Sequence, residues 1–396
     1  MRSGHKQILI FLLFFVSFTG IYGQETDSIA QQKEKKWSLH GYVKDMVTFN
    51  FSADSIMADN LIHNRLNFKW YPNDKFTFHL EVRNRIFFGS MVKAIPNYGD
   101  FIDTNNDFFD LSALPVNKNN FILHTMIDRA YVQYTKDKWE FRLGRQRINW
   151  GTNIVWNPND LFNAYSFFDF DYEERPGSDA IRITRYNNFA SSIELAAKIA
   201  SDIDSTVIAM LYKFNVSQYD IQFIGGVANG DYSVGVGWAG NLKNVGFKGE
   251  MTYFTPYENR PASYNAFVAS AGLDYSFPNS LYVMGSWLYN SAANNQFSSQ
   301  ENFLMSPNRL SSKNLMPIKN SAFVQASYPV HPLVNAGLSL MTFPGDNAVF
   351  INPSVSISIR ENFDLGFFGQ LFFNEKLNGN YGSAASLLFM RAKWSM

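Results

Sequence analysis

The sequence predicts an all-β protein, a transmembrane antiparallel up-and-down β-barrel of about 18 strands. Segments that alternate apolar and polar residues recur along the chain, and the connections between them sort into a short set and a long set. Aromatic residues make up 17% of the chain, yet no long apolar run follows the N-terminal region. A membrane barrel needs this pattern, because each strand shows one face to lipid and the other to a polar lumen.

The alternation is clearest in residues 75–85, KFTFHLEVRNR. Phe76, Phe78, Leu80 and Val82 share one parity, while the residues between them are polar or charged. Side chains of a strand point to opposite faces in turn, so this period of two predicts a strand with an apolar outer face and a wet inner face. The same reading predicts strands near 37–50, 61–71, 75–85, 121–136, 139–150, 179–186, 189–200, 206–214, 219–228, 232–239, 245–254, 264–277, 281–290, 320–329, 333–343, 348–360, 363–374 and 382–396.

The connections between these strands alternate in length. One set consists of tight turns, such as 72–74 and 137–138, whereas the other contains the long segments 90–120, 151–178 and 291–319. Short periplasmic turns and long extracellular loops are typical of an outer-membrane barrel, and a soluble sandwich does not sort its loops in this way. Aromatic residues flank the tight turns, as Trp70 and Trp139 do, which predicts a girdle at the periplasmic interface.

The chain divides into residues 1–23, predicted to be a signal peptide, a short periplasmic lead at 24–36, and the outer-membrane barrel at 37–396. Arg2 and Lys6 precede an apolar run from Ile8 to Phe18 that is too short for a bilayer-spanning helix. We therefore expect the cell outer membrane of a Gram-negative cell, with contacts to its lipid and lipopolysaccharide and to the barrel-assembly machinery. The formal net charge is zero, which argues against nucleic acid as a partner.

The inner face of the early strands is predicted to be basic. A parity break at Gly144 predicts a β-bulge that would turn the following arginines inward. A cationic wall in a narrow pore concentrates anions, although such arginines could instead bridge acids of neighbouring strands. The predicted channel-lining residues are His63, Arg65, Lys69, His79, Glu81, Arg83, Arg85, Arg129, Arg142, Arg145, Arg147 and Arg182.

The connection 151–178 is rich in Asn, acidic and aromatic residues. We expect it to fold into the mouth as a constriction opposite the basic wall; the alternative is an extracellular cap on the barrel rim. The predicted constriction residues are Asn157, Asn159, Asp160, Asp169, Asp171, Glu173, Glu174 and Arg175.

The lead at 24–36 is too short to form a plug domain, so the sequence predicts a passive channel for small anionic or carbohydrate-like solutes. A non-conducting barrel that binds partners through its loops is the alternative. We expect no enzyme, cofactor or metal site, because no serine lies in a nucleophile elbow and the histidines lack metal spacing. Residues 103–107, DTNND, begin like a calcium loop but lack its glycine and its final glutamate.

Three short motifs carry a family resemblance: FRLGRQRINWG, WNPNDLFN and ERPGSDAIRI. Together they resemble outer-membrane porin-like proteins that include the alginate-export porins, over roughly residues 140–185. The resemblance implies an 18-stranded barrel with an arginine-lined conduit for an anionic polysaccharide. It would place Arg142, Arg145 and Arg147 in that conduit, with the acids Asp160, Asp169, Asp171, Glu173 and Glu174 on the loop. The chain departs from the usual assembly signal, because it ends in Trp394-Ser-Met rather than an aromatic residue.

Overall fold

The computed structural model describes residues 35–51, 55–103, 107–165, 168, 177–200, 205–258, 263–293, 310–345, 347–375 and 381–396. The predicted signal peptide and most of the predicted periplasmic lead lie outside these residues.

Strands dominate the described residues, and two short helices accompany them. The helices are α2 (Ser90–Ala94) and α3 (Tyr98–Ile102). The strands are β1 (Trp37–Phe51), β2 (Ile56–Asn73), β3 (Phe76–Gly89), β4 (Ser112–Lys118), β5 (Phe121–Lys136), β6 (Trp139–Gln146), β7 (Ser178–Asn188), β8 (Ser191–Lys198), β9 (Val207–Val216), β10 (Tyr219–Ala228), β11 (Asp231–Leu242), β12 (Val245–Pro256), β13 (Ala266–Ser276), β14 (Tyr282–Asn290), β15 (Asn320–His331), β16 (Val334–Phe343), β17 (Ala348–Arg360), β18 (Phe363–Glu375) and β19 (Tyr381–Ser395).

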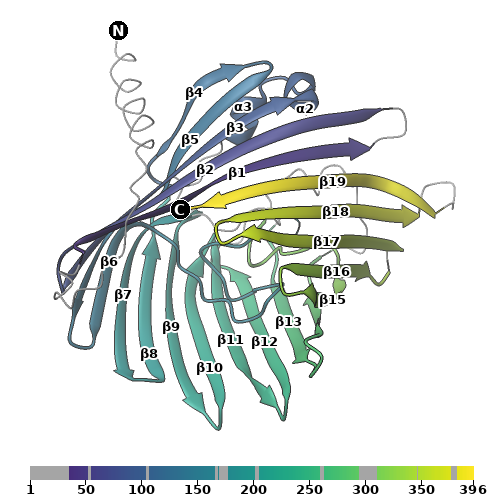
Figure 1. Ribbon diagram of the computed structural model, residues 1–396. Helices are drawn as coiled ribbons and strands as arrows, with labels where there is room; N and C mark the ends of the chain where they lie inside the picture. Colours follow the sequence, from purple (N-terminus) through teal and green to yellow (C-terminus); the bar gives the residue numbers. More distant parts are fainter. Residues whose placement is uncertain are drawn as a thin grey trace.

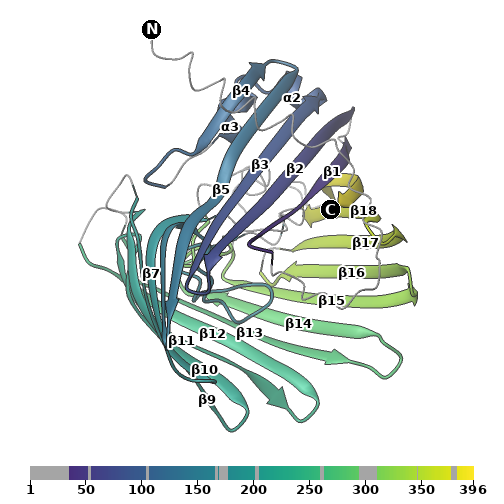
Figure 2. The same cartoon turned by 60° about the vertical axis from the view of Figure 1, so that its left-hand side comes forward.

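The strands form one closed antiparallel sheet (Figures 1 and 2). β1 pairs with β2 on one side and with β19 on the other, which closes the barrel. β4 pairs with β5 alone, while β3 passes directly to β5. Eighteen of the described strands therefore form the wall, and the predicted fold class is confirmed.

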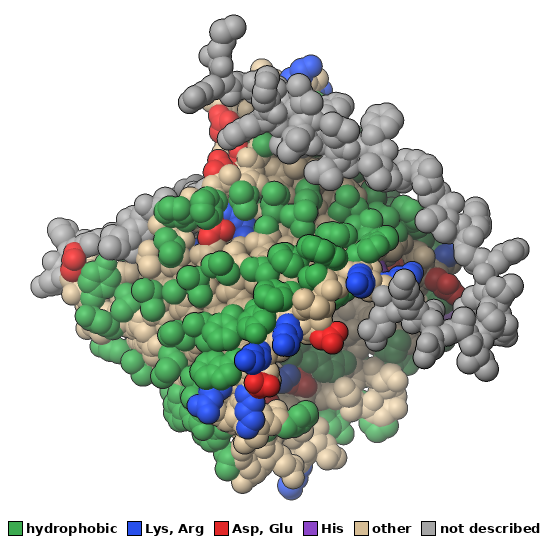
Figure 3. Space-filling model, turned by 90° about the vertical axis from the view of Figure 1, so that its left-hand side faces the viewer, with side chains coloured by type: hydrophobic (Ala, Val, Ile, Leu, Met, Phe, Trp, Pro, Cys, Tyr) green, Lys and Arg blue, Asp and Glu red, His purple; other side chains and the backbone are tan. Residues whose placement is uncertain are grey.

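The two faces of the wall differ as the alternation predicts. On β3, Phe76 and Phe78 are exposed on the outside, whereas Glu81 and Arg83 are buried on the inside. In Figure 3, hydrophobic side chains cover much of the outer face, and charged side chains gather mainly in one patch of its lower half. A closed barrel with an apolar outer face and a polar inner face places the protein in the outer membrane.

Aromatic side chains meet across the strands near the tight turns. Trp70 lies 5.1 Å from Phe78, and Phe76 lies 4.8 Å from Tyr134, measured between ring centroids. These pairs form a girdle at the turn end of the barrel, where aromatic rings settle at a membrane interface.

None of the helices among the described residues has the length and apolar character needed to cross a bilayer.

Three details differ from the sequence prediction. The segment 90–120, expected as a connection without strands, contains α2, α3 and β4. The strand expected at 139–150 ends at Gln146, because the chain then turns into the barrel. The bulge predicted at Gly144 was wrong: this glycine has a φ of 118°, but β6 pairs without a register shift with both neighbours. The irregularity lies instead between β3 and β5, at Glu81 and Val82, where Asp128 is passed over in the pairing.

Candidate functional site in the barrel lumen

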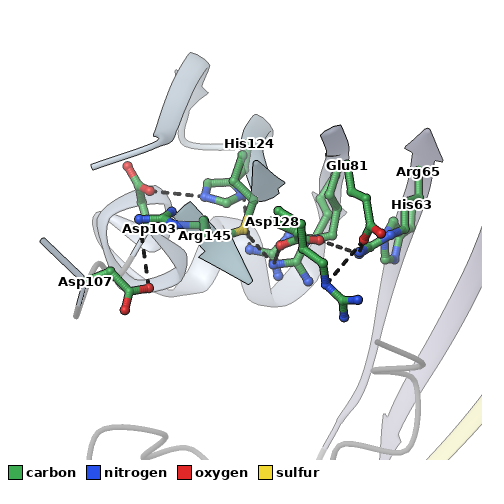
Figure 4. A network of polar contacts seen from close by, with 12 residues as sticks. His63, Arg65, Glu81, Asp103, Asp107, His124, Asp128 and Arg145 are labelled. Carbon is green, nitrogen blue, oxygen red and sulfur yellow. Dashed lines mark hydrogen bonds and ion pairs between the residues drawn. The ribbon is translucent and has the colours of Figure 1, made fainter. Parts of the chain in front are cut away.

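The inner wall of β2, β3 and β5 carries a buried ionic network (Figure 4). The Arg65 side chain is 1% exposed and pairs with the carboxylates of Glu81, at 2.5 Å, and of Asp128. Asp128 reaches this network because the register shift in β5 turns it inward. Buried charges persist in proteins only when they are paired and hydrogen-bonded, which this arrangement provides.

The carboxylates of this wall are each shared by two guanidinium groups. Glu81 pairs with Arg65 and also with Arg129, at 3.4 Å, and Asp128 pairs with Arg65 and also with Arg83, at 3.0 Å. Three guanidinium groups thus meet two carboxylates, so this part of the network carries one more positive than negative charge.

The same sharing continues along the wall to β6 and β7. Glu140 pairs with Arg142 at 3.0 Å and with Arg182 at 2.9 Å, and Arg182 also approaches Glu194 on β8 at 3.7 Å. The side chains of Arg129 and Arg142 are 18% and 22% exposed. These two guanidinium groups are therefore the ones in the shared network that lie most open to the lumen.

The other predicted wall residues occupy varied positions. His63 is buried beside the Tyr42 hydroxyl, at 3.5 Å, and the His79 ring stacks on Tyr131 at 4.3 Å. Arg85 contacts His124 Nδ1 at 3.1 Å. Lys69 is half-buried on the inner row of β2, and Arg147 lies just beyond the end of β6. Arg145 is buried and forms two 2.9 Å bonds with the Asp179 carboxylate on β7.

Sequence reasoning confined the basic wall to the early strands and missed three cations beside it. Lys44 on β1 and Arg391 and Lys393 on β19 lie on the inner rows that pair across the closure of the barrel. Their alternation with Val43 and Trp394 was a usable signal. Sequence reasoning also missed the acids Glu140 and Glu194, which share the inner parity of their strands, and Asp128, whose orientation depends on the register shift.

The segment 150–165 runs inside the barrel. Its residues contact inner side chains of strands spread around the wall: the Trp150 indole N–H donates to Glu194 on β8 at 2.6 Å, and Gln222 on β10 donates to the Trp150 carbonyl at 2.7 Å. Ser270 on β13 donates to the Trp156 carbonyl at 2.8 Å. Only a segment within a closed barrel can reach these strands together.

A single buried carboxylate, that of Glu250 on β12, fixes the centre of this segment. Its Oε1 accepts the backbone N–H groups of Thr152 and of Asn153, the latter at 2.7 Å, and its Oε2 accepts that of Asn159 at 3.0 Å. Glu250 is fully buried, and no ion pair to it occurs within the described part of the chain. Its charge is satisfied by hydrogen bonds that converge from the loop.

The predicted constriction residues divide into two groups. Asn157, Asn159 and Asp160 are buried within this segment, and the Asn159 side-chain oxygen accepts from Thr252 at 2.7 Å. The remainder of the set lies outside the described residues, namely Asp169, Asp171, Glu173, Glu174 and Arg175.

An apolar core fills the space between this segment and one side of the wall. Trp156 meets Phe323 of β15, and Leu315 and Met316 of the segment 310–319 belong to the same cluster. The wall contributes inner apolar residues from β7, with Ala180, to β18, with Phe372. The arginine-bearing inner wall of β2 to β7 borders this core.

The described residues contain no group of three or more His, Cys, Asp or Glu side chains arranged to hold a metal ion.

Comparison with known proteins finds no matching family model and no matching curated protein.

Solved structures do match over most of the chain. Acinetobacter baumannii OccAB4 is 10% identical with a TM-score of 0.56, covering 93% of this chain and 100% of that one. A. baumannii OccAB2 is 7% identical with a TM-score of 0.57, covering 91% and 98%. Pseudomonas aeruginosa OccK8 (OprE) is 9% identical with a TM-score of 0.54, covering 91% and 98%. At these identities the likeness shows the fold, which is that of outer-membrane porins.

Proposed function

We propose that the protein is a passive outer-membrane channel for small anionic solutes, including acidic sugars. The observation that carries the proposal is the excess of arginine in this network, in which five guanidinium groups meet the four carboxylates of Glu81, Asp128, Glu140 and Glu194. Such a wall attracts anions into a narrow lumen and disfavours cations.

The arrangement of the loop supports the same reading. Segment 150–165 crosses the lumen from Glu194 on β8 toward β12, β13 and β15, with its apolar core beside it, which narrows the space left beside the guanidinium groups. A guanidinium fork binds a carboxylate through two parallel hydrogen bonds. Carboxylated solutes are therefore the class that this wall suits best.

Passage of an anionic polysaccharide is the second candidate, on the motif resemblance at 140–185. Two of those motifs meet in the structure, since Arg145 of one pairs with Asp179 of the other. This pair joins β6 to β7, which gives the motif residues a structural role besides any contact with cargo.

Reversal potentials in planar bilayers under a KCl gradient test the proposal. Replacing Arg129 and Arg142 together with Gln should lower the anion preference, because these are the most exposed guanidinium groups of the shared network. Arg185→Gln is the matched control, since it removes a cation that lies over the outward Trp139 ring, at 5.5 Å.

A cation-selective parent protein would contradict anion selectivity, and a barrel that carries no current would favour the partner-binding alternative. Exclusion of small acids together with passage of acidic oligosaccharides would favour the polysaccharide conduit.

A further inference from the structure

The connection between β3 and β4 folds into the extracellular end of the lumen. The Met91 backbone N–H donates to Asp59 Oδ1 at 2.8 Å, and the Tyr98 ring lies 5.9 Å from Phe87. Asp59 and Phe87 belong to the inner rows of β2 and β3, since they share the parity of Arg65 and Arg83. This segment therefore covers the end of the basic wall that faces the loops.

Asp103 and Asp107 of this connection have carboxylates that contact an imidazole and a lysine of the wall. Asp103 Oδ1 lies 3.1 Å from His124 Nε2, and the other ring nitrogen of His124 contacts Arg85. Asp107 Oδ1 lies 3.1 Å from Lys198 Nζ. Figure 4 shows Asp103 beside His124 and Asp107 below Arg145, both to the left of the network of Arg65, Glu81 and Asp128.

Arg145 stands beside the Asp107 position. Its Nη2 is 3.9 Å from Asp107 Oδ2, although its main partner is Asp179. The cations around Asp107 thus form a binding position for a carboxylate, and the protein's own side chain occupies it.

The two carboxylates of these contacts are more open to water than the Arg65 pairs below them. The side chains of Asp103 and Asp107 are 21% and 15% exposed, and that of Lys198 is 14% exposed, whereas Arg65 is 1% exposed. Water and salt weaken accessible ion pairs much more than buried ones. The contacts at the mouth can therefore exchange while the deeper network stays intact.

We propose that Asp103 and Asp107 occupy the outermost carboxylate-binding positions of the basic wall, and that anionic solutes enter by displacing them. This inference rests on the proposed anion channel. An incoming carboxylate takes over the contacts with Lys198 and with the His124–Arg85 pair, so these groups keep an anionic partner throughout. Leaving such cations unpaired would be unfavourable in a confined lumen.

The test is the citrate concentration that half-blocks the chloride current when citrate is added on the loop side. Replacing both carboxylates, in Asp103→Asn with Asp107→Asn, removes the internal competitor. The half-blocking concentration should fall about tenfold, equivalent to about 1.4 kcal/mol.

The matched control is Asp100→Asn with Asp110→Asn, which removes the same charge from the same connection. Asp100 contacts Asn117 at 3.4 Å and Asp110 contacts Ser112 at 2.8 Å, and neither forms an ion pair with a wall residue among those that the structure describes. We expect the control to leave the citrate block unchanged. An unchanged block in the first variant, or an equal fall in both variants, would overturn the proposal.

Lys198→Gln gives an independent test in which the half-blocking concentration should change in the opposite direction. This variant can be used even if the Asp103→Asn, Asp107→Asn variant does not assemble. Removing this cation from the wall should raise the half-blocking concentration, and a block that does not weaken would also overturn the proposal. A parent protein without current or with cation selectivity would instead contradict the proposed function, so the two failures are distinguishable.

Discussion

Glu250→Ala tests whether one carboxylate holds the internal loop in place. The substitution removes the acceptor of the backbone N–H groups of Thr152, Asn153 and Asn159. A hydrogen bond to a charged group contributes about 1.5–3 kcal/mol net, so the three bonds together contribute at most roughly 4.5–9 kcal/mol. Water that enters the lumen will solvate part of the freed backbone, which leaves about 3 kcal/mol or more acting on this segment.

A free-energy change of that size raises the population of the displaced loop relative to the bound loop by more than about 100-fold. Other anchors remain, such as the bond from Trp150 to Glu194, so the segment should move locally rather than leave the barrel. Single-channel recording should therefore show a higher and noisier conductance. Heat-modifiable gel migration checks that the barrel still assembles.

Two further variants separate this explanation from a general effect of charge. Glu250→Gln keeps one acceptor oxygen and should fall between the parent and Glu250→Ala. Asp274→Asn removes an acid whose partner is Lys248 on the neighbouring strand, at 3.2 Å, and should leave the noise unchanged. A Glu250→Ala channel with the conductance and noise of the parent would refute the assignment of Glu250 as the loop anchor.

Two other substitutions test the assignment of faces and the buried network. Leu80→Arg places a charge on the outer row of β3. Near the middle of the bilayer this costs roughly 2–4 kcal/mol, so the yield of membrane-inserted protein should drop. A normal yield would show that the inner and outer faces are assigned the wrong way round. Arg65→Met removes the guanidinium group that Glu81 and Asp128 share and leaves each with one arginine, and breaking a buried pair costs up to about 3–5 kcal/mol. The temperature at which the folded gel band disappears should therefore fall. It should not fall for Lys213→Met, because Lys213 and its partner Asp220 are both more than 40% exposed. Equal effects of the two substitutions would contradict a structural role for Arg65.

Much of the inner wall was predictable from local pattern. Arg83 and Glu81 were expected on the inside because they alternate with Leu80 and Val82, and the structure places them there. That Arg65 is enclosed between two carboxylates was not predictable from its own strand. One of its partners, Asp128, lies 63 residues away in sequence and faces inward only because β5 shifts register against β3.

The sequence by itself determined the strands of the barrel wall, their two faces and the sorting of short turns from long loops, but not β4. These features depend on side chains that alternate with a period of two and on residues adjacent in the chain. Only the tertiary structure decided that segment 150–165 crosses the lumen and that Glu250 holds it, 98 residues beyond Thr152. It also decided which acid each arginine shares, because closing the barrel brings together side chains whose distances no local pattern encodes.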